Sequence, residues 1–131
     1  MKEITGINHI GLRVKDLAVT RAFYEKLGFK FIAGPLGPEP VAIMEHPSGA
    51  NINFILNASK EHSINVLMDV PEKHTGFTHV ALEVADLDVV QGNLAALGFP
   101  LTGGPITTPE GASFIFIRDP DGNVIEFHKP A

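Results

Sequence analysis

Cysteine is absent from this chain of 131 residues. Disulfide bonds and thiolate metal ligands are therefore excluded, and the absence fits a cytoplasmic protein. Long apolar runs are absent too: no stretch reaches the ~18 residues of a membrane-spanning helix, and the N-terminus lacks a signal-peptide pattern. Basic residues are not in excess, because the net charge is −5, whereas a nucleic-acid-binding surface needs clustered positive charge. We expect neither a membrane nor a nucleic acid as a partner.

Several enzyme fingerprints are also missing. The chain has no nucleophile elbow, phosphate-binding P-loop, dinucleotide fingerprint or zinc-knuckle spacing. What remains is an ordinary globular composition, 44% hydrophobic and 19% charged, in a chain long enough to bury a real core as one domain. Six histidines in a chain without cysteine are the first indication of chemistry.

The most informative feature is an internal repeat. When the segment 6–31 is laid without a gap on the segment 76–101, ten of the 26 aligned positions are identical. A second match places 45–56 on 118–129. The period is longer than that of a solenoid repeat, so we interpret the chain as two copies of one module.

Each module is predicted to have the order β-α-β-β-β. The segment 7–14 alternates with period two, as a strand does, and the helix that follows has Asp16 as its N-cap and Gly28 at its end. The rest of the first module is predicted as a strand at 29–33, a Pro/Gly-rich loop at 34–40 and a hairpin of 41–45 with 51–56. The second module is predicted as a strand at 77–84, a helix at 86–97 between Asp86 and Gly98, a strand at 99–102, a loop at 103–111 and a hairpin of 113–117 with 124–128. A further short strand is predicted at 64–68.

The sequence therefore predicts an α+β fold within a single domain over 1–131. Its two βαβββ modules, about 4–57 and about 76–131, are joined by a connection at 58–75. We expect them to form a cupped, mostly antiparallel eight-stranded sheet with the two helices outside.

Two pairs of polar residues occupy equivalent positions in the modules: His9 with His79, and Asn53 with Glu126. Strand alternation places all four on the face that points away from the helices. Imidazole and carboxylate suit Fe, Ni, Zn, Mn or Co, and two histidines with one carboxylate leave positions open for a substrate. Descent from one duplicated position would also explain the histidine pair, but Glu126 is an acid on an apolar strand and needs a partner there. We predict one divalent metal ion held by His9, His79 and Glu126, with Asn53 as a weaker amide ligand.

Neighbours of these residues are expected to line a substrate pocket. They are polar or aromatic residues on the same strands or the adjoining one: Asn51, Phe114, Phe116 and His128. The other histidines are interpreted as surface or turn residues rather than as catalysts: His46, His62 and His74.

The paired modules, the opening HIGLRV…D…FYEKLGF and the closing DPDGNVIEF resemble the vicinal oxygen chelate superfamily. That group includes glyoxalase I, extradiol dioxygenases, methylmalonyl-CoA epimerase, fosfomycin-resistance proteins and bleomycin-binding proteins. The resemblance covers almost the whole chain and implies metal ligands at His9, Asn53, His79 and Glu126, and a homodimer. It also implies that the metal acts as a Lewis acid on a small substrate bound through two adjacent oxygens, with Glu126 as the catalytic group that shuttles a proton.

Departures from the pattern separate the members of the superfamily. Bacterial glyoxalase I usually has glutamate where Asn53 stands, whereas the epimerase has glutamine there. Extradiol dioxygenases carry an additional histidine and a tyrosine at positions that match about 51–53 and Ile115, and both are missing here. Ser113 is the one counterpart of the phosphonate-binding residues of fosfomycin-resistance proteins, and it joins the predicted pocket. Bleomycin binders lack the metal ligands.

We expect a glyoxalase-like lyase or isomerase. The alternatives are a single-domain Fe(II) extradiol dioxygenase and a non-enzymatic protein that binds a drug or a metabolite.

Overall fold

The structure is a computed structural model, and it describes residues 1–61 and 64–131. The chain divides into two compact units, Met1–His62 and Ser63–Ala131, and each unit is described by itself. In the described ranges, no helix is both long enough and apolar enough to cross a membrane.

The first unit is one mixed sheet with one helix. Its elements are β1 (Ile10–Arg13), α1 (Leu17–Lys26), β2 (Lys30–Leu36), β3 (Val41–Glu45) and β4 (Asn51–Ile55). The strands hydrogen-bond in the order β1-β4-β3-β2, and only the β1–β4 pair is parallel. The crossover from β1 to its parallel neighbour therefore contains the helix and the β2–β3 hairpin.

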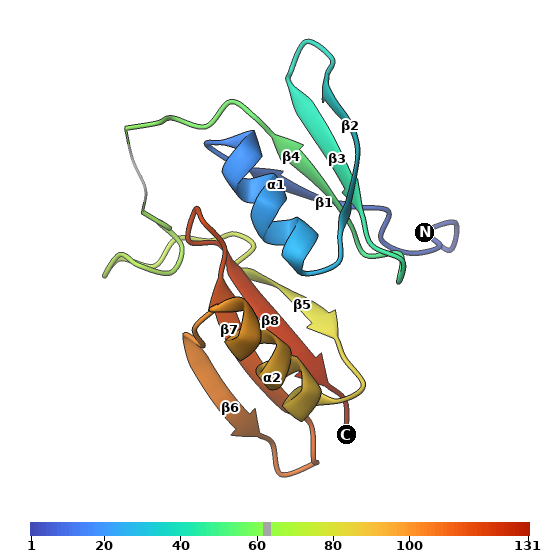
Figure 1. The fold of residues 1–131 in the computed structure, drawn as a ribbon, viewed down its shortest axis with the longest axis vertical. Helices are drawn as coiled ribbons and strands as arrows, with labels where there is room; N and C mark the ends of the chain where they lie inside the picture. Colours follow the sequence, from blue (N-terminus) through green and yellow to red (C-terminus); the bar gives the residue numbers. More distant parts are fainter. Residues whose placement is uncertain (62–63) are drawn as a thin grey trace. The chain divides into compact units, whose positions relative to one another are not determined.

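The second unit repeats this arrangement (Figure 1). Its elements are β5 (His79–Glu83), α2 (Leu87–Leu97), β6 (Gly103–Thr107), β7 (Ser113–Arg118) and β8 (Val124–Lys129). The strand order is β5-β8-β7-β6, with β5 and β8 parallel. The predicted α+β fold with two βαβββ modules is confirmed, and its eight strands form two sheets of four.

The helix ends follow the predicted capping chemistry. The side chains of Asp16 and Asp86 accept hydrogen bonds from Val19 N and Val89 N, each at 3.1 Å. These bonds satisfy backbone N–H groups that have no partner inside the helix. Gly98 ends α2 in the left-handed conformation, which costs least for a residue without Cβ.

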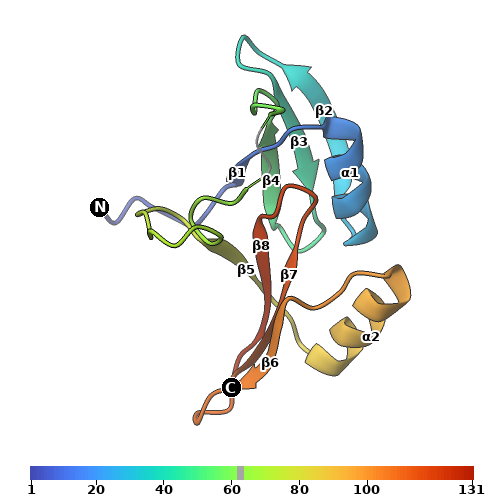
Figure 2. The same cartoon turned by 90° about the vertical axis from the view of Figure 1, so that its left-hand side faces the viewer.

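Each helix covers one face of its own sheet (Figure 2). In the second unit the strand residues beneath α2 are apolar and fully buried, with Ile115, Ile117 and Ile125 at most 1% exposed. Helix α2 contributes Leu94, which is 2% exposed. Burying each such side chain stabilises the fold by roughly 1.5–3 kcal/mol. The alternate strand residues point to the opposite face, which is the face that carries the candidate site.

Two predicted loops prove to be partly strand. Strand β2 continues through Gly34-Pro35 to Leu36, and the second strand of the second module lies at β6 rather than at 99–102. Both are edge strands, where proline is tolerated because no neighbouring strand needs its missing N–H. An ideal Cβ at Gly34 would lie 2.6 Å from Ala42 Cα, so the close backbone approach requires glycine. Gly34-Pro35 and Gly104-Pro105 occupy equivalent positions in the repeat, a signal that could have placed both strands.

The strand predicted at 64–68 is wrong, because the segment forms a turn. Asn65 Oδ1 accepts hydrogen bonds from Leu67 N and Met68 N at 3.1 and 3.2 Å, which closes the chain back on itself. Asn65 Nδ2 also donates to Gly122 O at 3.1 Å, so this part of the connection is attached to the β7–β8 turn.

A bidentate ion pair strengthens the same attachment. Both terminal nitrogens of Arg118 donate to the carboxylate of Asp69 at 3.0 Å. The side-chain hydrogen bonds from Arg118, and secondarily its positive charge, hold the pKa of Asp69 below its usual value. Residues 64–69 therefore belong structurally to the second unit.

Candidate metal centre

The open face of the second sheet has Glu126 at its middle. On β8 this residue pairs with Ala81 of β5 on one side and with Phe116 of β7 on the other. Its neighbours in sequence, Ile125 and Phe127, point to the helix side and are 1% and 7% exposed. The carboxylate of Glu126 thus projects from the face that α2 leaves uncovered, and its side chain is only 10% exposed.

His79, at the start of β5, meets this carboxylate. Its Nε2 lies 3.0 Å from Glu126 Oε2, and 39% of its side chain is exposed. Two ligands placed 90° apart at about 2.1 Å from one ion are themselves about 3.0 Å apart. The pair therefore fits the spacing of two neighbouring metal ligands as well as that of a direct hydrogen bond.

The second ring nitrogen of each candidate histidine has a partner from the residue just before it. His79 Nδ1 lies 2.9 Å from Thr78 Oγ1, and His9 Nδ1 lies 2.7 Å from Asn8 Oδ1. An amide oxygen only accepts, so the contact with Asn8 Oδ1 favours the tautomer of His9 that has its proton on Nδ1 and its lone pair on Nε2. The Thr78 hydroxyl can accept or donate, so it supports His79 in either tautomer.

Such an outer contact orients the ring of a metal-binding histidine. Thr78 does this for His79 without selecting its tautomer, whereas Asn8 Oδ1 also favours one tautomer of His9. Sequence reasoning missed both Asn8 and Thr78. Their positions, equivalent in the repeat and each directly before a repeated histidine, are the signal that could have found them.

His128 lies on the other side of Glu126. Its Nδ1 is 2.7 Å from Glu126 Oε1, and its ring stacks on Phe114 with the planes 4° apart. Phe114 meets Phe116 edge to face, and Phe116 meets His79 in the same way at 6.1 Å. The structure thus brings together five of the predicted site residues on one face: His79, Phe114, Phe116, Glu126 and His128.

The predicted residues of the first unit occupy the corresponding sheet. His9 immediately precedes β1 and is exposed, and Asn53 pairs with Gly11 at the centre of β4 and is half-buried. Asn51 lies two residues earlier on the same face of β4. Within residues 1–61 and 64–131, no group of three histidine, aspartate or glutamate side chains is arranged to hold a metal ion. What the second unit provides is a two-ligand pair, and the complete ligand set stays a prediction.

Ser113 differs from the other residues of the predicted pocket. It begins β7 and, by strand alternation, points to the opposite face from Phe114 and Phe116. Of the remaining histidines, His74 is exposed, His46 is half-buried with its Nδ1 2.7 Å from Ser48 Oγ, and His62 lies outside the described residues.

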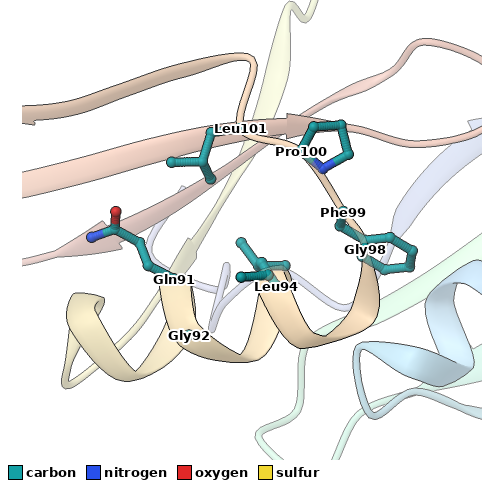
Figure 3. Close-up of a pocket in the computed structure, with 8 residues that line it drawn as sticks. Gln91, Gly92, Leu94, Gly98, Phe99, Pro100 and Leu101 are labelled. Carbon is teal, nitrogen blue, oxygen red and sulfur yellow. The ribbon is translucent and has the colours of Figure 1, made fainter.

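The second unit also has a shallow hollow, on its helix side (Figure 3). Helix α2 bounds it with Gln91 and Leu94, and the chain after the helix closes it with Phe99, Pro100 and Leu101. Its lining is mostly apolar and contains no titratable side chain. The hollow therefore offers no side chain for acid–base or metal chemistry, in contrast to the face that carries Glu126.

Two βαβββ units, one of which carries an imidazole–carboxylate pair on its open face, define the class of protein. The chain belongs to the Glyoxalase/Bleomycin resistance protein/Dioxygenase superfamily, whose sequence profile matches residues 6–127. The vicinal oxygen chelate resemblance is thereby confirmed.

Individual relatives span different activities. The chain is 27% identical to the metallothiol transferase FosB of Bacillus licheniformis over 96% of its own length and 76% of that protein. It is 32% identical to the lactoylglutathione lyase GLX1 of Arabidopsis thaliana over 90% of its length, but it spans only 42% of that lyase. A glyoxylase/bleomycin resistance protein/dioxygenase domain from Frankia sp. EAN1pec shares the fold, with a TM-score of 0.80, 21% identity and coverage of 98% and 94% of the two chains.

Proposed function

We propose that the chain is a divalent-metal enzyme that acts on a small substrate with two adjacent oxygens. The observation that carries the proposal is the contact between His79 Nε2 and Glu126 Oε2, in which each group has a further partner that orients it. These donor atoms suit Fe, Ni, Zn, Mn or Co.

His9 is proposed as the third ligand and Asn53 as a weaker fourth. The support for His9 is its equivalence to His79 in the repeat and its contact with Asn8 Oδ1, which favours a proton on Nδ1 and leaves Nε2 available to ligate. The first-unit ligands come from the same chain or from a second copy in a homodimer. A cytoplasmic setting belongs to the same proposal.

A bound ion would act as a Lewis acid toward the two substrate oxygens. The chain's own contribution centres on Glu126. Glu126 would take up and return a proton, and His128, whose Nδ1 lies 2.7 Å from Oε1, would orient its carboxylate. The rings of Phe114 and Phe116 cover the sheet beside it and would exclude water from one side of the substrate.

Among reaction types we favour a lyase or isomerase, supported by the similarity to the lactoylglutathione lyase. The dioxygenase alternative has less support, because one position that would bear its acid–base group is the fully buried Ile115. The pair of His79 with Glu126 counts against a purely drug-binding role. The name of the metallothiol transferase relative adds thiol transfer to the reactions worth assaying.

The test is a turnover screen on protein loaded in turn with each of the five metals. The substrates are a hemithioacetal, an epoxide with a thiol, and a catechol with oxygen uptake recorded. The matched pair of variants is Glu126→Gln and Glu83→Gln, since Glu83 lies on the same face at an exposed position. We expect turnover that falls by about 10²-fold or more in Glu126→Gln, the scale of a lost acid–base group, and that is kept in Glu83→Gln. Turnover that is equal in both variants, or absent with every metal, contradicts the enzyme proposal.

A further inference from the structure

We propose that His128 is a positioning residue, held by Phe114, that fixes the Glu126 carboxylate in the orientation needed to face His79. The inference rests on the proposed function and assigns a separate role within the same site. His128 does not touch the substrate in this account. It acts through Glu126.

The contact that carries the inference runs along one strand. His128 and Glu126 are two residues apart on β8, so their side chains share a face. His128 Nδ1 lies 2.7 Å from Glu126 Oε1. A carboxylate oxygen accepts, so the imidazole donates from Nδ1, and this distance is that of a short, strong hydrogen bond.

Phe114 fixes the ring that makes this bond. It is the cross-strand partner of His128 on β7, and the two rings stack with their centroids 5.6 Å apart and their planes 4° apart. The stack sets the plane of the imidazole, and with it the direction in which Nδ1 points. Phe116 supports the stack from the side, because its ring meets Phe114 edge to face at 5.7 Å.

The consequence falls on the other oxygen of Glu126. The terminal torsion of a glutamate is broad, so an unsupported carboxylate samples many orientations. With Oε1 bound to His128, Oε2 is turned toward His79 Nε2 at 3.0 Å. The two candidate ligand atoms are therefore held together before any ion arrives, which reduces the entropy lost on binding it.

The repeat shows that this arrangement is not simply inherited from the duplicated module. In the alignment that places Glu126 on Asn53, His128 falls on Ile55 and Phe127 on Phe54. The apolar helix-side residue is the same in both modules, whereas the carboxylate and its histidine occur together only in the second. A histidine two residues further on thus occurs only in the module whose predicted ligand at this position is a carboxylate.

The experiment compares His128→Asn with His128→Leu. The two replacements have nearly the same shape, but only asparagine keeps an N–H donor near the place of Nδ1. The probe is Co²⁺, with its affinity measured by competition with a coloured chelator and its ligand geometry read from the visible spectrum. His74→Leu, at an exposed histidine in the connection, is the control.

We expect His128→Leu to bind Co²⁺ about 10–100-fold more weakly with an altered spectrum, the usual effect of losing a hydrogen bond to a metal ligand. His74→Leu should stay close to the wild type. His128→Asn keeps a donor but loses the stack on Phe114, and Phe114→Leu keeps the imidazole but loses the same stack, so both should lie between the wild type and His128→Leu. The inference is overturned if His128→Leu binds as the wild type does, or if His128→Asn is as weak as His128→Leu.

A metal-free measurement separates this inference from the proposed function. In ¹⁵N NMR spectra of the metal-free protein, His128 should carry its proton on Nδ1, and Glu126→Ala should release it to the Nε2 tautomer that is common in free histidine. A wild type that binds no Co²⁺ contradicts the proposed function, while this spectrum still decides the role of His128. An Nε2 proton on His128 in the wild type would overturn the inference.

Discussion

Replacing Gly104 by alanine should destabilise the second unit far more than the same change at Gly98. Both glycines lie in the left-handed region, with φ of +79° and +74°. An ideal Cβ at Gly104 would lie 2.6 Å from Phe114 O and 3.1 Å from Ile115 Cα, whereas a Cβ at Gly98 would have no neighbour within 4 Å. The two φ angles are thus similar, and the collision of the added Cβ is the difference that the comparison tests.

The expected losses of folding stability follow from the cost of the left-handed conformation and the cost of the collision. The left-handed conformation costs an alanine roughly 1 kcal/mol. Forcing a methyl group against the backbone of β7 adds about 1–3 kcal/mol, because a packed interior yields little. Gly98→Ala should therefore lower the free energy of unfolding by about 1 kcal/mol and Gly104→Ala by about 2–4 kcal/mol.

Urea unfolding followed by far-ultraviolet circular dichroism measures both differences. The chain has no tryptophan, so the backbone signal is the suitable probe. Equal losses for the two variants would refute the close approach of β6 to β7 at Gly104. A larger loss at Gly98 would refute it more strongly.

Two smaller changes test the capping and the attachment of the connection. Asp86→Ala removes the acceptor for Val89 N and should lower the free energy of unfolding by about 1 kcal/mol in the same urea assay; a loss no larger than that of exposed Asp88→Ala would contradict the cap. Asp69→Asn should destabilise the protein at neutral pH but not in acid. The folded-state pKa of Asp69 is lowered, so its stabilisation is present above the unfolded value of 3.8 and is lost as the pH falls through the folded pKa. Urea midpoints of the variant and the wild type, measured from pH 7 down to pH 2, check this. A difference in midpoint that stays constant with pH would contradict the prediction.

The sequence was sufficient to predict the βαβββ module and its repetition. Asp16 and Asp86 are capping residues with a local mechanism, and the period-two strands around Phe54 and Phe127 indicate their buried faces. These features depend on neighbours in the chain, so a sequence pattern is sufficient to find them.

The edge strands were harder to predict, because their local composition indicates a loop, whereas pairing with a neighbouring strand makes them part of the sheet. Gly34-Pro35 and Gly104-Pro105 have the composition of loops, yet each lies in a strand that pairs along one side only. The turn at Asn65 was missed for a similar reason. Its side chain bonds both its own turn and Gly122, a partner far away in the sequence.

In the candidate site, too, some features could be predicted from the sequence and others could not. Alternation and the repeat predicted that His79, Glu126 and His128 share a face, and the structure brings them together. The pattern could not show which oxygen of Glu126 each histidine contacts, or that Phe114 stacks on His128, since these depend on side-chain torsions and cross-strand register. Ser113 joined the predicted pocket because of the family resemblance, although strand alternation places it on the opposite face from Phe114 and Phe116.

The most direct test of the account is the metal content of the purified protein. Wild type and Glu126→Ala are prepared anaerobically without chelators, and elemental mass spectrometry counts the divalent ions. We predict about one ion per chain in the wild type and a clear loss in Glu126→Ala, because Glu126 supplies one of the two ligand atoms that the second unit holds together. A wild type that contains no metal, even after reconstitution with iron, nickel, zinc, manganese and cobalt, would contradict the metal centre and leave the open face of the sheet as a binding surface.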